Sequence, residues 1–140
     1  MWRAEQVSKI TINADDLHSE VMRILSDYGE EGSRAVSLAV EDEASEIRNK
    51  IRSEAKSAGV KGSGRYKGGW QIKKSYSHYG RQCTIYNGVV PGLAHLLENG
   101  HRVVVRGKTV GQAKAYPHIA KATEGMESDL LDKIKSNLGN

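Results

Sequence analysis

The feature that most constrains the fold is a stripe of apolar residues in the first half of the chain. Its members are spaced alternately by four and three residues, which places all of them on one side of an α-helix. The stripe consists of Val36, Val40, Ala44, Ile47, Ile51, Ala55 and Ala58. We therefore expect a long helix that is capped by Ser33 and ends at Gly59, with about 26 residues at about 1.5 Å each.

Shorter patterns precede this helix. Residues 7–12 alternate between polar and apolar, as in a short strand, while residues 1–12 as a whole could instead be flexible. Asn13 has a suitable side chain for a helix N-cap, and the apolar positions from Leu17 to Tyr28 have helical spacing. A first helix is thus expected before the long one.

The second half reads as strands followed by a helix. Alternation predicts strands over 70–79, 83–87 and 101–106, and residues 93–98 suggest a short helix. Beyond Pro117 we expect one last helix with an Asp129–Lys133 pair and the stripe Ala122, Met126, Leu130 and Ile134. The order predicts one α+β domain over residues 1–140, with long N-terminal helices, a small antiparallel sheet and a C-terminal helix.

Charge divides the chain into three zones. Residues 1–60 have a net charge of −4, residues 61–121 of +10 and residues 122–140 of −2. The basic zone also holds 10 of the 15 glycines, and we expect residues 59–69 to form a mobile basic loop. Such a zone can pair with the acidic helices of its own fold, with an acidic protein or a second copy, or with nucleic acid.

Several function classes find no support. The only cysteine, Cys83, excludes an internal disulfide and a multi-cysteine zinc site. The longest apolar runs, such as Val103–Val105, are far shorter than the roughly 20 residues of a membrane span. We expect no membrane association.

Histidines give the only hint of catalysis. His95, Glu98 and His101 lie in the segment HLLENGH, and His118 follows. A zinc-protease helix needs two histidines four residues apart, whereas His95 and His101 are six apart and therefore on different helix faces. A ligand set of all four stays open, but we expect His95 to pack or cap and His101 to begin a strand. With no nucleophile–base arrangement and no phosphate-loop spacing, we expect no enzyme and no cofactor.

Four segments together resemble a known family. GSGRYKGGW, TIYN, PGLAHLLENGH and YPHIAKATE are similar to the lambdoid-phage minor tail component family, the gene-product-ten-like head–tail joining, neck and tail-completion proteins of tailed bacteriophages. The resemblance covers roughly residues 15–135. It implies a long N-terminal helix, a glycine-rich stretch, a strand pair, the HLLENGH segment and a last helix.

The resemblance also implies a function. It predicts a structural protein of a phage or prophage virion that is made in the host cytoplasm and works at the head–tail junction or tail. Its partners would be other virion proteins, and it would form a homo-oligomeric ring when assembled, with a monomer in isolation and non-specific DNA contact both open. The alternatives are a small basic nucleic-acid-binding module and a small metal-dependent hydrolase.

Two sets of residues are singled out. Contacts with protein or DNA are expected from the basic zone, through Arg65, Tyr66, Lys67, Lys73, Lys74, Arg102, Arg106 and Lys108. An architectural role is expected for Trp70, Leu93, His95, Leu96, Leu97, Glu98, Gly100, His101, Pro117 and His118. Within the second set, the three leucines are expected to pack, Gly100 to turn the backbone and Glu98 to accept hydrogen bonds. Trp70 could instead be an aromatic anchor beside Tyr66.

Overall fold

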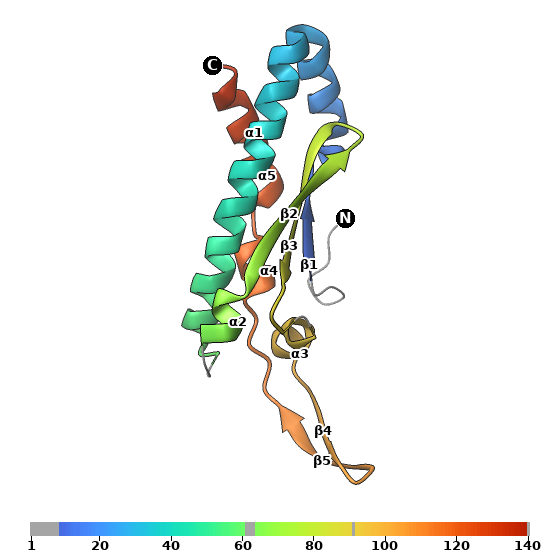
Figure 1. The fold of residues 1–140 in the computed structure, drawn as a ribbon, viewed down its shortest axis with the longest axis vertical. Coiled ribbons are helices and arrows are strands. Elements are labelled where there is room, and N and C mark those ends of the chain that lie inside the picture. Colours follow the sequence, from blue (N-terminus) through green and yellow to red (C-terminus); the bar gives the residue numbers. More distant parts are fainter. Residues whose placement is uncertain (1–8, 61–63, 91, 140) are drawn as a thin grey trace.

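The computed structural model describes residues 9–60, 64–90 and 92–139. A layer of helices covers one face of a small antiparallel sheet, and a separate two-stranded hairpin projects from one end of the molecule (Figure 1). This arrangement confirms the predicted α+β class. The predicted strand over residues 7–12 is present as β1 (Lys9–Ile12), while residues 1–8 lie outside the described part of the chain.

The longest helix reverses direction within itself. Helix α1 (His18–Ala58) follows a 3₁₀ turn, η2 (Asp15–Leu17), and is interrupted at Gly29, which has φ 56° and ψ −126°. The two segments on either side of Gly29 run back along one another (Figure 1). They approach so closely that a Cβ on Gly32 would lie 2.8 Å from the carbonyl oxygen of Ile24. The predicted Ser33 cap is wrong, because the second segment begins directly after Gly29.

The main sheet has three strands in the order β1–β3–β2. Strand β2 (Trp70–Ser77) and β1 both pair antiparallel with β3 (Gly80–Asn87). One face of the sheet packs on α1. The residues of the predicted helical stripe from Val36 to Ala55 are fully buried in the core. The buried apolar residues of the sheet are Ile10, Ile12, Trp70, Cys83 and Ile85.

The last helix is divided in two. Helices α4 (Ile119–Ala122) and α5 (Met126–Asn137) are separated at Gly125, whose φ of 73° ends the helical path. Helix α5 packs along α1 (Figure 1). The predicted Asp129–Lys133 pair is wrong, because both side chains cross to α1, where Lys133 contacts Glu43 and Asp129 contacts Lys50.

The predicted mobile loop over 59–69 is also partly wrong. Gly59 ends α1 in a left-handed conformation as expected, but Gly64–Gly68 form a short helix, α2. The reason is that Tyr66 is buried, and its carbonyl oxygen accepts a hydrogen bond from Asn87 of β3. Residues 61–63 lie outside the described part. None of the helices in the described ranges is long and apolar enough to cross a bilayer.

Candidate partner-binding hairpin and the network at its base

The hairpin that projects from the body is built from the last two strands. Strands β4 (His101–Val105) and β5 (Lys108–Ala113) pair antiparallel through a turn at Arg106 and Gly107. Both turn residues have positive φ, 51° and 78°, as a type I′ hairpin turn requires. Val110 is inserted as a bulge, because Val103 faces Gly111 while Val104 faces Thr109. We call residues 101–113 the hairpin arm.

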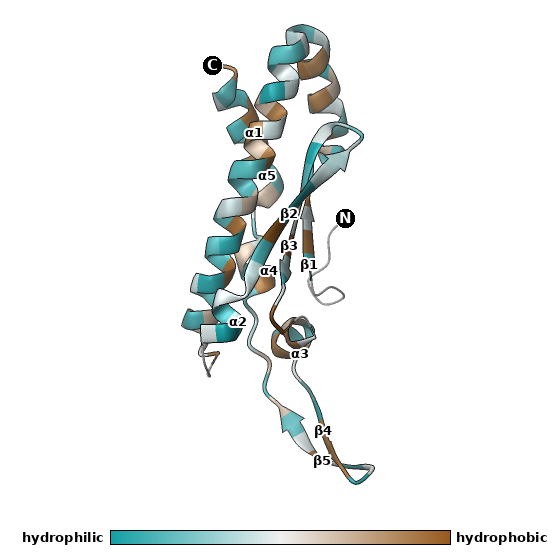
Figure 2. Ribbon diagram, viewed as in Figure 1, coloured by the Kyte–Doolittle hydropathy of each residue, from teal (hydrophilic) through white to brown (hydrophobic). Residues whose placement is uncertain are grey.

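The hairpin arm exposes apolar side chains on both faces. Val103, Val104, Val105 and Val110 are 38%, 54%, 51% and 61% exposed. Alternation along β4 puts Val103 and Val105 on one face and Val104 on the other (brown segment of β4 in Figure 2). A two-stranded hairpin is marginally stable alone in water, and exposed apolar patches mark interaction sites. Valines that their own fold leaves about half exposed are therefore candidates for a partner contact.

The charged residues of the hairpin arm are all basic. It carries Arg102, Arg106 and Lys108 and no acidic residue. Among the residues that the structure describes, none of these three cations forms an ion pair. The arm thus offers both apolar contact and positive charge.

Glu98 fixes the base of the arm. It lies at the end of α3 (Leu93–Asn99), and its side chain is almost fully buried. Its Oε1 accepts hydrogen bonds from the backbone N–H groups of His118 and Ile119 at 2.8 Å, and its Oε2 accepts one from Ala120 at 3.0 Å. The carboxylate therefore caps the N-terminus of α4, where negative charge is favoured.

His118 extends this network. Its Nδ1 lies 2.6 Å from the carbonyl oxygen of Tyr116, and its Nε2 lies 2.6 Å from the Tyr66 hydroxyl oxygen. Since a carbonyl only accepts, Nδ1–H donates to Tyr116, and the same nitrogen lies 3.2 Å from Oε1 of Glu98. Burial, with the charge of Glu98 nearby, raises the pKa of Tyr66, so its phenol stays protonated.

Backbone contacts hold the two legs of the arm together. The N–H of Tyr116 donates to the carbonyl oxygen of Leu97 at 2.7 Å. Gly100 has a φ of 73°, and a Cβ there would lie 2.7 Å from the carbonyl oxygen of Ala113. The segments HLLENGH and YPHIAKA, which are well separated in sequence, are thus the two halves of one structural unit.

The predicted contact residues do not form one surface. Arg102, Arg106 and Lys108 lie on the hairpin arm, whereas Arg65 and Lys67 belong to α2. Neighbouring strand residues point to opposite faces, so Lys73 is exposed on the open face of the sheet while Lys74 faces α1. There its Nζ donates to Glu41 at 2.7 Å and lowers the pKa of that carboxyl.

Three assignments need correction. Tyr66 is 5% exposed and hydrogen-bonded to His118, so it is a core residue and not a surface anchor. Leu93 and Leu96 are each 37% exposed, because α3 turns Ala94 and Glu98 toward the core instead. Trp70 is buried and packs edge-on against Tyr66, so it is a core residue and not an aromatic anchor at the surface.

The four residues considered as a metal-ligand set do not lie together, because two are at the surface and two are in the interior. His95 is exposed, and its Nδ1 lies 3.1 Å from Nδ2 of Asn99. His101 is exposed at the start of β4. Glu98 and His118 are buried, and the oxygens of Glu98 are taken up by backbone N–H groups. Within the described ranges, no three His, Cys, Asp or Glu side chains are grouped as metal ligands.

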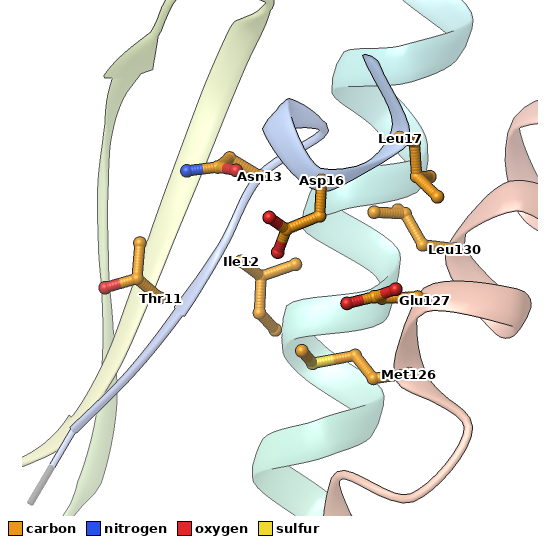
Figure 3. A pocket seen from close by; sticks show the side chains of 8 residues that line it. All are labelled: Thr11, Ile12, Asn13, Asp16, Leu17, Met126, Glu127 and Leu130. Atoms are coloured by element: carbon orange, nitrogen blue, oxygen red, sulfur yellow. The ribbon is translucent and has the colours of Figure 1, made fainter. Parts of the chain in front are cut away.

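Two of the hollows in the described part lie away from the hairpin arm. One lies between η2 and α5, has a volume of about 20 Å³, and brings the carboxylates of Asp16 and Glu127 to its wall (Figure 3). That volume holds about one water molecule. The other is an open groove of about 470 Å³ beside the turn of α1, lined by Arg23, Ile24, Asp27, Tyr28, Lys135 and Leu138.

Comparison with known proteins gives no relative for this chain. No family model, curated protein or solved structure matches it. The family resemblance therefore stays a prediction from the quoted motifs.

Sequence reasoning missed some residues of this unit. Asn87 holds α2 through the Tyr66 carbonyl and also accepts hydrogen bonds from the N–H groups of Val89 and Val90. The exposed valines of β4 were also read as an ordinary strand. The available signal was the string HRVVVR, in which consecutive valines leave no polar face for solvent.

Proposed function

We propose that this chain is a structural protein of a tailed bacteriophage or prophage that joins head to tail as a neck or tail-completion component. The observation that carries this proposal is the hairpin arm, which is clamped at its base and exposes valines and cations beyond the core. Joining proteins work by surface complementarity, and a projecting element of this kind supplies contact area that the subunit does not use itself.

The family resemblance supports the same function. Its most specific segments, HLLENGH and YPHIAKA, form the base that orients the hairpin arm. A protein whose role is to present this arm has a physical reason to contain both segments.

We propose that the chain acts without catalysis. The buried Tyr66, His118 and Glu98 are hydrogen-bonded to one another or to backbone groups, and neither of the described hollows is lined by them. In this proposal its partners are other virion proteins at the head–tail junction or tail, and its copies form a ring in the assembled particle.

The test is deletion of the coding sequence from the phage or prophage that carries it. We expect electron microscopy of the lysate to show filled heads and complete tails that are not joined, and a plasmid copy to restore infectious particles. Joined, infectious particles without the protein would contradict the proposal.

The nucleic-acid alternative has one observation in its favour, the absence of acidic residues from the hairpin arm. A DNA-binding module should bind duplex DNA as a monomer, and its affinity should fall steeply with salt, by a slope of about −0.9 per phosphate contact. Charge reversal in the arm should then weaken DNA binding and leave head–tail joining intact.

A further inference from the structure

The hairpin arm and the turn of α1 lie at opposite ends of the molecule's long axis (Figure 1). The arm of one subunit therefore cannot reach the α1 turn of the same subunit. Any contact between these two regions has to join two copies.

The α1 turn, by which we mean residues 18–34, is acidic, whereas the hairpin arm is basic. Residues 18–34 contain four acidic side chains, Glu20, Asp27, Glu30 and Glu31, against the two basic ones Arg23 and Arg34. All four acidic residues are exposed, and in the described part of the chain none of them forms an ion pair. The basic arm and this acidic turn are complementary in charge.

The same region also exposes apolar surface. Met22 is 49% exposed and Tyr28 is 39% exposed. Ile24, Tyr28 and Leu138 line the groove of about 470 Å³ beside the turn, and its charged lining residues are Asp27, Arg23 and Lys135. A receiving site for valines needs such apolar surface, and the exposed carboxylates of Glu20, Glu30 and Glu31 outside the groove would orient the basic arm as it docks.

We propose that the hairpin arm of one copy binds the acidic α1 turn, and the groove beside it, on a second copy. The contact is head-to-tail, because each copy uses one surface at each end. Repetition of such a contact closes into a ring when the rotation between copies allows it. The contact deepens the proposed function and rests on it, since it names the surfaces through which copies assemble.

Other occupants fit less well. Two arms would bring together Arg102, Arg106 and Lys108 from both copies, and like charges repel. A DNA backbone would neutralise these cations but would leave the valines of β4 in water, because phosphate contacts are polar.

The conformation of Arg106 agrees with a contact at the tip. Asn, Asp and Gly are the usual residues at positive φ in a type I′ turn, whereas Arg106 adopts a φ of 51°. Strain of this kind is concentrated at functional positions. An arginine at the tip places its charge at the point of the arm that lies farthest from the body.

A charge-swap experiment tests the contact. The arm variant is Arg102→Glu/Arg106→Glu/Lys108→Glu, and the turn variant is Asp27→Lys/Glu30→Lys/Glu31→Lys. Self-association is measured by sedimentation velocity and light scattering, after circular dichroism has shown that each variant is folded. We expect each variant alone to associate at least about tenfold more weakly than the wild type. An equimolar mixture of the two should regain association, because the opposite charges meet again.

A matched control changes the total charge by the same amount as the arm variant. Lys9→Glu/Lys56→Glu/Lys121→Glu replaces three exposed lysines outside both surfaces and should associate like the wild type. Arg106→Asn removes the charge but keeps the backbone conformation of the turn, since asparagine tolerates positive φ. It should weaken association while keeping the arm folded.

Defined outcomes would overturn the contact. They are a wild type that stays monomeric at about 1 mM, an arm variant that associates normally, or a mixture that does not regain association. Loss of DNA affinity alone in the arm variant would also overturn it. Any of these together with unjoined heads and tails in the deletion strain would remove this contact and leave the proposed function. Normal particles from the deletion strain would remove the proposed function itself.

Discussion

Gly29 has a backbone conformation that side chains oppose. Its φ of 56° and ψ of −126° lie outside the regions open to L-residues, and this single residue sends the second segment of α1 back along the first. Glycine has no Cβ, so it adopts this geometry without strain.

We expect Gly29→Ala to lower the free energy of unfolding by about 1–3 kcal/mol, because the alanine would be held in a disfavoured conformation. Urea denaturation measures this. Gly92→Ala is the matched control, since Gly92 has a φ of −76° and open space where its Cβ would lie. Equal stability of the two variants would show that Gly29 can be replaced without strain.

Glu98 links three backbone N–H groups through one carboxylate. An amide in its place can still accept at one oxygen, but its NH₂ group would face an N–H donor. Buried donors left without acceptors are costly.

We expect Glu98→Gln to destabilise the protein by about 1–3 kcal/mol and to speed hydrogen exchange at the N–H groups of His118, Ile119 and Ala120. Exchange is followed by mass spectrometry and stability by urea denaturation. Glu124→Gln, at an exposed position between α4 and α5, should change neither. Unchanged exchange in Glu98→Gln would mean that the carboxylate is not the cap.

At the scale of elements, Lys133 is one of the polar side chains that join α5 to α1. Lys133 donates to Glu43 at 2.9 Å and also pairs with Glu46. Glu43 is fully buried, and its Oε2 has no hydrogen-bond partner among the described groups. Burial raises the pKa of Glu43, whereas the hydrogen bond from Lys133 lowers the pKa of Glu46.

Removing Lys133 should make stability depend on pH. We expect Lys133→Met to cost about 3–5 kcal/mol near pH 7, because it leaves a buried carboxylate without a cation. A raised folded pKa means that stability is retained below the unfolded pKa, about 4.3, and is lost as pH rises through the folded pKa. The loss should therefore shrink in acid.

Urea denaturation at several pH values measures this dependence. Lys121→Met is the control for removing an exposed lysine and should show no such pH dependence. Lys133→Met/Glu43→Gln should regain much of the lost stability, because no buried charge remains. A loss in Lys133→Met that is the same at every pH would contradict the assigned cause.

The elements differ in how far the sequence could predict them. The apolar stripe of α1 and the alternation of β2 and β3 are local signals, and they gave these elements correctly. The division of the last helix and the helix α2 were missed, because they depend on Gly125 and on the buried Tyr66–His118 contact. Such contacts join residues far apart in sequence and leave no periodic pattern.

The candidate site was predictable only in part. Glu98 could be named as an acceptor because it is the one carboxylate of the HLLENGH segment. Its partners 20–22 residues further along could not be named from spacing. Residues 101–106 looked like any short strand, since the sequence does not show that nothing in the subunit covers it.

At the scale of the whole molecule, the hairpin arm can be separated from the body. Its residues from Arg102 to Gln112 are all exposed. Because His101 faces Ala113 in the strand register, an Asn-Gly pair could close the chain at that point as a two-residue turn.

We expect replacement of residues 102–112 by Asn-Gly to leave the free energy of unfolding within about 0.5 kcal/mol of the wild type, because no buried side chain is removed. Thermal and urea denaturation measure this, and light scattering should show that self-association is lost. A shortened protein that fails to fold would show that the arm belongs to the core. One that still assembles would show that the arm is not the contact.

The Glu98 cap belongs to the body, whose buried residues determine the fold. The hairpin arm beyond it consists of exposed residues that the fold does not require. We expect substitutions at the exposed residues 102–112 to change neither the core nor the direction in which the arm leaves it. A chain built in this way could acquire a new binding specificity by exchanging about a dozen surface residues, while the framework that carries them stays as it is.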